Sequence, residues 1–104
     1  MVNRQIRTIC ADTWFARLIG MIGTNRSVWE NRQLLIVPCK AIHTFGMGYA
    51  LDVAFIDCDG KILTIHHAVK PGRILRGPHT TMATIERPAQ EGSWYRPEDR
   101  CEDI

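Results

Sequence analysis

The stretch that most constrains the fold is residues 51–57, with the sequence Leu-Asp-Val-Ala-Phe-Ile-Asp. Side chains of a β-strand alternate between its two faces, and here one face would carry Leu51, Val53 and Phe55, the other Asp52, Ala54 and Ile56. Because both faces are apolar, we expect this strand in the centre of a sheet. Burying an unpaired carboxylate is costly, so Asp52 needs a partner. Backbone N–H groups or an arginine such as Arg17 would serve in a purely structural role.

The segment just before this strand combines His43, Phe45 and Met47 with two glycines. Apolar side chains on such a segment often line a ligand or partner groove, and packing in the core is the alternative. If the chain folds back at residues 46–50, His43 and Asp52 could form an imidazole–carboxylate pair. That pair would suit acid–base chemistry, or it would simply satisfy a core histidine.

Other candidate chemistry is weaker. Cys39 lies four residues before His43 and is the best candidate for a thiol–histidine pair, with a buried, inert cysteine as the alternative. A metal site would need Cys39, His43 and one of His66, His67 or His79, but this spacing matches no zinc template. We therefore assign no metal and no cofactor.

Hydrophobic patterning predicts the remaining elements. A helix is expected from an N-cap at Asp12 or Thr13 to a stop at Gly23, with apolar residues at helical spacing. Further strands are expected at residues 5–9, 33–37, 61–67 and 79–87, and the Asp-Gly pair within residues 57–61 predicts a hairpin turn. Residues 70–78 are expected to form a loop. The fold class is thus mainly β (α+β), a small antiparallel β barrel or sandwich with one N-terminal helix.

Length and charge exclude several classes of protein. A chain of 104 residues forms one domain, which we place at residues 1–95, followed by a polar C-terminal tail at 96–104. The net charge of +2 and the lack of aromatic residues within the basic loop Lys70–Arg76 argue against nucleic-acid binding. No apolar run is long enough for a transmembrane helix. The N-terminus shows no signal peptide, so we expect a cytoplasmic protein whose four cysteines are reduced.

The pattern C-x-A-I-H-T-F-G-M, then L-D-V-x-F-I-D, then D-G-K-I-L, resembles the uncharacterised bacterial and archaeal family called domain of unknown function 192. Arg17 to Met21 is similar to the R-x-x-G-M helix motif of that family, and the resemblance covers Ile9 to Ala89. Two positions depart from the family pattern, because Gly48 stands where a basic residue is common and Ala50 where a proline is common. The resemblance implies the β fold, and many relatives look exported.

We interpret the chain as a non-catalytic binding or accessory module rather than an enzyme. Its ligand or partner pocket is expected to use the residues Arg17, His43, Phe45, Met47 and Asp52. The resemblance hints at an association with pilus assembly or secretion, the partner being an unknown small ligand or protein and the chain a monomer or weak dimer. The first alternative is a small hydrolase or lyase using His43 and Asp52, and the second is a metal-binding protein.

Overall fold

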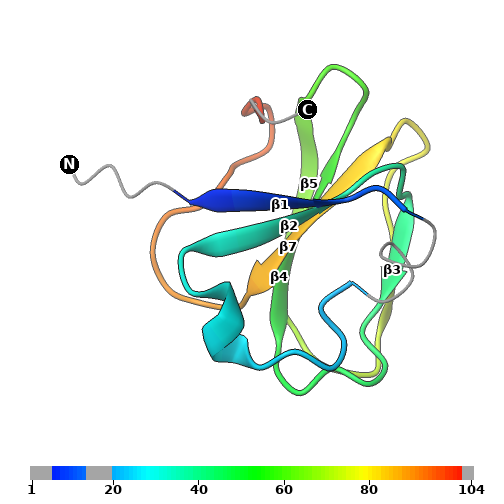
Figure 1. The fold of residues 1–104 in the computed structure, drawn as a ribbon. Helices are drawn as coiled ribbons and strands as arrows, with labels where there is room; N and C mark the ends of the chain where they lie inside the picture. The colour runs from blue at the N-terminus through cyan, green and yellow to red at the C-terminus, as the bar shows by residue number, and fades with distance from the viewer. Residues whose placement is uncertain (1–5, 14–19, 102–104) are drawn as a thin grey trace.

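The computed structural model describes residues 6–13 and 20–101, and β-strands are its main elements (Figure 1). In chain order these elements are β1 (Arg7–Ala11), the 3₁₀ helix η1 (Arg26–Trp29), β2 (Arg32–Ile36), β3 (Ala41–His43), β4 (Leu51–Ile56), β5 (Ile62–Val69), β6 (Ile74–Arg76) and β7 (Ala83–Pro88). A five-stranded sheet has the order β1-β2-β7-β4-β5, and β3 pairs with β6 in a second sheet. The prediction of a mainly β fold is confirmed.

Strand β4 is an interior strand of the larger sheet, as its two apolar faces predicted, although β7 holds the middle position. It lies between β7 and β5, and all six of its residues are buried. One core cluster contains Leu34, Ile36, Leu51, Val53 and Phe55, and the other contains Leu35, Ala54, Ile56, Ile62 and Ile85. The alternation along each strand therefore separates two cores, one on each face of the sheet.

The two-stranded sheet of β3 and β6 covers one of these faces (Figure 1). Ile42 of β3 belongs to the core cluster of Val53 and Phe55, and Leu75 of β6 packs against it. In the described residues the larger sheet is open, because β1 and β5 each pair with one neighbour. The barrel alternative is therefore wrong for the described chain, whereas sandwich-like packing of two sheets is compatible with it.

One strand pairing departs from the predicted antiparallel arrangement. β1 pairs in parallel with β2, from Arg7 opposite Arg32 to Ala11 opposite Ile36. A parallel pair needs a long connection rather than a tight turn, and residues 12–31 separate β1 from β2 in the chain. The remaining pairings, between β2 and β7, β7 and β4, β4 and β5, and β3 and β6, are antiparallel.

The described residues do not support the predicted N-terminal helix. Most of it falls on residues 14–19, which include Arg17 and lie outside the described residues. Residues 20–23 form a turn, with φ of +56° at Gly20 and +83° at Gly23. Because a left-handed residue ends a right-handed helix, Gly20 excludes Met21 from one. Among the described residues, η1 is the helical segment.

The predicted Asp-Gly turn is confirmed, and the structure adds two strands that the sequence did not reveal. The Asp57 carboxylate accepts hydrogen bonds from the N–H groups of Asp59 and Lys61, both at 2.9 Å, and Gly60 has a φ of +86°. β3 and β6 have three residues each, too few for an alternation to be recognised. Part of the predicted loop at residues 70–78 is thus strand β6.

The described part of the predicted polar tail lies against the edge of β5. Ile62 donates to the Asp99 carbonyl at 2.7 Å, and Cys101 donates to the Gly60 carbonyl at 2.7 Å. The side chain of Cys101 is buried in the second core cluster. The domain boundary at residue 95 stays a prediction.

Candidate functional site

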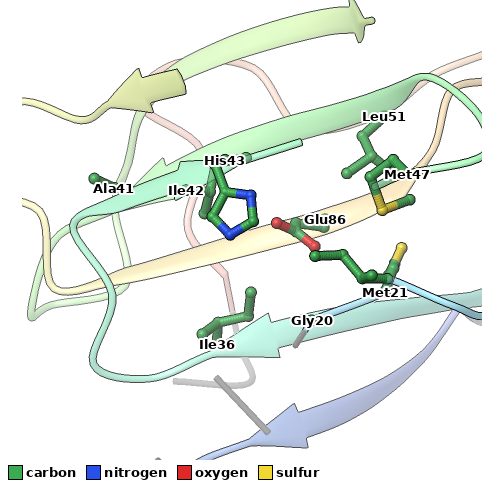
Figure 2. Close-up of a pocket in the computed structure, with 10 residues that line it drawn as sticks. Gly20, Met21, Ile36, Ala41, Ile42, His43, Met47, Leu51 and Glu86 are labelled. Carbon is green, nitrogen blue, oxygen red and sulfur yellow. The ribbon is translucent and has the colours of Figure 1, made fainter. Parts of the chain in front are cut away.

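A cavity of about 120 Å³ lies between β3 and the five-stranded sheet (Figure 2). Its lining residues come from β2, β3, β4, β7 and two turns, and they are Gly20, Met21, Ile22, Ile36, Ala41, Ile42, His43, Met47, Leu51 and Glu86. All but two of these have apolar side chains or no side chain. The exceptions are His43 and Glu86, which Figure 2 shows pointing toward one another across the cavity.

Glu86 is the most unusual residue of this cavity. It lies in β7 between Leu34 of β2 and Val53 of β4, and its exposed fraction is 4%. Its carboxylate has no hydrogen bond or ion pair to any residue in the described part of the chain. Burial raises the pKa of Glu86 from 4.5 to about 7, because a low-dielectric environment disfavours the charged form.

Gly20 leaves space for this carboxylate. A Cβ atom at Gly20 would lie 3.4 Å from Oε1 of Glu86, at the short end of ordinary van der Waals contact. The φ of +56° at Gly20 is a second reason for glycine there. The backbone of the turn thus approaches Glu86 closely without a side chain between them.

Thr44 fixes β3 and thereby His43. Its buried hydroxyl donates to the Lys70 carbonyl at 2.7 Å and accepts from the Arg73 N–H at 2.8 Å. The next turn is closed by the Met47 N–H, which donates to the Thr44 carbonyl at 3.2 Å, and Gly46 has a φ of +83°. This turn directs Met47 into the cavity, where its exposed fraction is 8%.

An apolar surface adjoins the mouth of the cavity. His43 is exposed and its ring lies 5.6 Å from the ring of Phe45. Phe45 is 51% exposed, and Ile74, which pairs with His43 across β3 and β6, is 70% exposed. With Ala41, Ile42 and His43 they line a shallow groove of about 330 Å³. The groove and the cavity share Ala41, Ile42 and His43, so both lie against strand β3.

Comparison with known proteins identifies the family. The model of the family DUF192, described as uncharacterized ACR, matches residues 2–92. The chain belongs to this family. The resemblance seen in the sequence is therefore confirmed for DUF192, and a search of curated proteins found no match.

Two solved structures share the fold of this DUF192 protein. One is a protein of unknown function from Novosphingobium aromaticivorans, with 16% identity, a TM-score of 0.68, and coverage of 81% of this chain and 64% of its own. The other is a candidate transcription regulator from Sinorhizobium meliloti, with 22% identity, a TM-score of 0.69, and coverage of 79% and 67%. The chain thus spans about two thirds of each protein, and at these identities the likeness establishes the fold.

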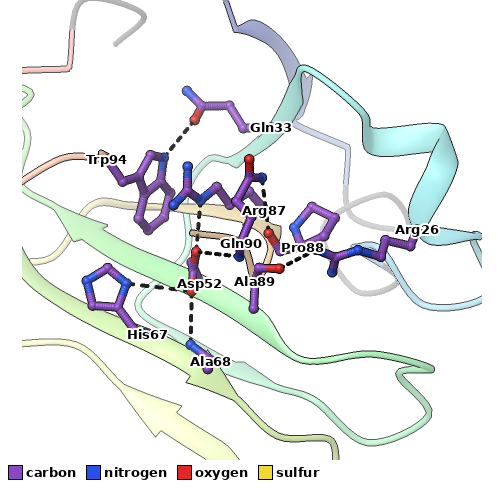
Figure 3. A network of polar contacts seen from close by, with 10 residues as sticks. All are labelled: Arg26, Gln33, Asp52, His67, Ala68, Arg87, Pro88, Ala89, Gln90 and Trp94. Carbon is purple, nitrogen blue, oxygen red and sulfur yellow. Dashed lines mark hydrogen bonds and ion pairs between the residues drawn. The ribbon is translucent and has the colours of Figure 1, made fainter. Parts of the chain in front are cut away.

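Asp52 lies on the other face of the five-stranded sheet (Figure 3). The Arg87 side chain donates to it at 2.8 Å, and the Ala68 and Gln90 N–H groups donate at 2.9 and 3.4 Å. His67 Nδ1 is 3.6 Å away. The guanidinium of Arg87 stacks over Trp94, with Cζ 4.6 Å from the ring centroid. Asp52 therefore has a buried partner, as its position in the sequence required. That partner is Arg87.

This placement corrects the expected grouping of site residues. His43, Phe45 and Met47 meet at the cavity and its mouth, whereas Asp52 is separated from them by the sheet. The contacts recorded for Asp52 do not include His43, so the imidazole–carboxylate pair of the hydrolase or lyase alternative is not formed. The reason is that residues 52 and 43 lie on strands of different sheets, with Asp52 on the face turned away from β3.

The cluster proposed for a metal is not assembled either. Within residues 6–13 and 20–101, no three His, Cys, Asp or Glu side chains are grouped so that they could hold a metal ion. The described helices also include none long and apolar enough to cross a membrane.

Sequence reasoning missed Glu86. Within the predicted strand at 79–87, alternation does place Thr84 and Glu86 on one face. A charged residue at that position is usually read as facing solvent. What buries Glu86 is the position of β7 between β2 and β4, which is set by long-range pairing.

Proposed function

We propose that this DUF192 protein is a non-catalytic binding module, and that the cavity beside Glu86 receives the end of a ligand or of a partner's side chain. The observation that carries the proposal is a carboxylate enclosed by apolar groups without a partner in the described chain. Uncompensated buried charges are costly, and ionisable groups with strongly shifted pKa values cluster at functional sites.

The form of the site favours binding by insertion. Its apolar walls and few polar groups are typical of ligand pockets, although its volume is below that of a site for a whole drug-sized molecule. The shallow groove at Phe45 and Ile74 offers contact area for the rest of the ligand. Large exposed apolar side chains beside a pocket are a common feature of interaction sites.

A catalytic role has less support. The hydrolase or lyase alternative relied on an imidazole–carboxylate pair of His43 and Asp52, and the partners of Asp52 are Ala68, Arg87, Gln90 and His67 instead. The association with pilus assembly or secretion, the cytoplasmic location and the monomeric or weakly dimeric state stay predictions.

The stability of Glu86→Leu tests the proposal. If Glu86 serves binding rather than folding, leucine should stabilise the fold by about 1–3 kcal/mol at pH 8, because an apolar group replaces a desolvated charge. Urea unfolding of both proteins gives this difference. Glu91→Leu is the matched control at an exposed position, with an expected change within about 0.5 kcal/mol.

A loss of stability in Glu86→Leu of about 2 kcal/mol or more would assign Glu86 to the fold and contradict the proposal.

A further inference from the structure

We propose that the cavity binds the ammonium end of an unbranched alkyl chain, with Glu86 as counter-ion, and that the same ligand places a carboxylate on the basic surface outside. This inference rests on the proposed function, and it names the chemical class of the ligand. The class is an ω-amino carboxylic acid, either as a free molecule or as a lysine side chain flanked by acidic residues in a peptide.

The ammonium group follows from the charge inside the cavity. A buried carboxylate is stabilised when a cation pairs with it at hydrogen-bond distance. Among the described residues that line the cavity, His43 of β3 is the one other titratable group, and those from β2, β4 and the two turns carry no charge. A ligand that supplies a cation would therefore fill the missing half of an ion pair.

The alkyl chain follows from the walls and the volume. Met21, Ile36, Met47 and Leu51 present methylene, methyl and thioether groups, which suit an apolar stem. An apolar cavity of roughly 150 Å³ accommodates benzene, so a cavity of about 120 Å³ has room for roughly five non-hydrogen atoms. One nitrogen and four carbons fill that space, the same number of atoms as in a whole lysine side chain.

The carboxylate follows from the charge around the mouth. Residues 38–51 and 60–85 contain no Asp or Glu, and Lys40, Lys70, Arg73 and Arg76 are exposed there. Arg76 lies opposite Ala41 of the cavity wall, and the Arg73 carbonyl accepts from the Thr44 N–H at 2.8 Å, next to His43. None of the four has a salt bridge within the described chain. An anion outside the cavity and a cation inside it would complement both charges.

Three six-carbon probes separate these requirements by calorimetric titration at pH 8. 6-Aminohexanoate carries both charges, hexylamine lacks the carboxylate and hexanoate lacks the ammonium group. We expect 6-aminohexanoate to bind at least about tenfold more tightly than hexanoate, since hexanoate leaves the buried charge unpaired. It should bind up to about fivefold more tightly than hexylamine, because exposed ion pairs contribute little.

Variants locate the two contacts. Glu86→Gln should weaken the binding of 6-aminohexanoate and of hexylamine by about tenfold or more. The double variant with Arg73→Gln and Arg76→Gln should reduce the affinity for 6-aminohexanoate to that for hexylamine and leave hexylamine unchanged. The amines should also bind more weakly as the pH falls through about 7, since protonation of Glu86 removes the charge.

Two further arms complete the test. The peptide acetyl-Asp-Lys-Asp-amide should bind more tightly than 6-aminohexanoate if the natural source is a protein segment, and less tightly if it is a free molecule. Arg17→Gln should not change the affinity for hexylamine. Tighter binding of hexylamine to that variant would identify Arg17 as the resident counter-ion and overturn the proposal.

Equal affinity for hexanoate and 6-aminohexanoate, or no effect of Glu86→Gln, would likewise overturn it. If Glu86→Leu is nevertheless stabilising, the binding function stands and the ligand belongs to another class.

Discussion

Glu86 and Arg87 are consecutive residues of β7 whose opposite charges lie on opposite faces of the five-stranded sheet. Arg87 pairs with Asp52 at 2.8 Å on one face, while Glu86 faces the cavity on the other. Because neighbouring strand residues point in opposite directions, the guanidinium of Arg87 cannot compensate the carboxylate of Glu86. Arg87 therefore has a counter-ion within the fold, whereas Glu86 has none among the described residues.

The raised pKa of Glu86 predicts a specific pH dependence of stability. Between about pH 4.5 and pH 7 the folded protein binds more protons at this residue than the unfolded chain does, so stability falls as the pH rises through that window. Since each tenfold change in acidity corresponds to about 1.4 kcal/mol, the full effect above pH 7 is about 3 kcal/mol. Glu86→Gln removes this effect.

Urea unfolding of wild type and Glu86→Gln at pH 4 to 8 measures it. The free energy of unfolding of the variant minus that of wild type should rise by about 3 kcal/mol from pH 4 to pH 8. Other titratable groups cancel in the difference. A difference that does not vary with pH would show that the Glu86 carboxylate has a partner in the folded state.

The pair of Asp52 and Arg87 should be essential for stability. Both side chains are about 2–3% exposed, so Asp52→Ala leaves a buried guanidinium without its counter-ion and should lose about 3 kcal/mol or more. The double variant Asp52→Leu with Arg87→Met removes both charges, and we expect it to recover most of this loss. Urea unfolding of wild type, Asp52→Ala and the double variant compares the two losses of stability.

His43→Ala is the comparison for this prediction, since His43 is exposed and its removal should change stability by less than about 0.5 kcal/mol. Similar losses of stability in Asp52→Ala and His43→Ala would contradict the finding that Asp52 and His43 do not interact.

Thr44 should control the position of β6 relative to β3. Thr44→Val keeps the shape of the side chain but removes the hydrogen bonds to Lys70 and Arg73. Because the groups left behind are partly buried, we expect a loss of about 1–3 kcal/mol and faster hydrogen exchange at the Arg73 amide. Thr80→Val, at an exposed position, is the matched control. Unchanged exchange at Arg73 would argue against this role.

Gly77 should tolerate no side chain. A Cβ atom there would lie 2.4 Å from the Thr81 hydroxyl and 2.8 Å from the Phe55 ring. Gly77→Ala should therefore destabilise the fold by about 2 kcal/mol, as overpacking of a core does. Gly48→Ala meets no atom within 4 Å and should be close to neutral. Thermal unfolding of both variants compares them, and equal midpoints would contradict the prediction.

The sequence alone was sufficient where the signal is local. The apolar residues on both faces of 51–56 predicted that β4 is an interior strand of the sheet, and the Asp-Gly pair predicted the turn before β5. The motif around His43 identified the family. His43 and Met47 line the cavity, and His43 and Phe45 line the groove. Each of these signals lies within a few consecutive residues, where the alternation of side chains or the backbone freedom of glycine determines the outcome.

The tertiary structure decided what depends on pairing between distant segments. The parallel register of β1 and β2, and the existence of β3 and β6, follow from hydrogen bonds between residues far apart in the chain. The same is true of the site. Whether Asp52 or Glu86 faces the cavity depends on which side of β4 and β7 the small sheet covers, and strand alternation permits either. The sequence by itself determined that a buried carboxylate needs a partner, and only the packing of the two sheets assigned Arg87 to Asp52 and left Glu86 facing a cavity.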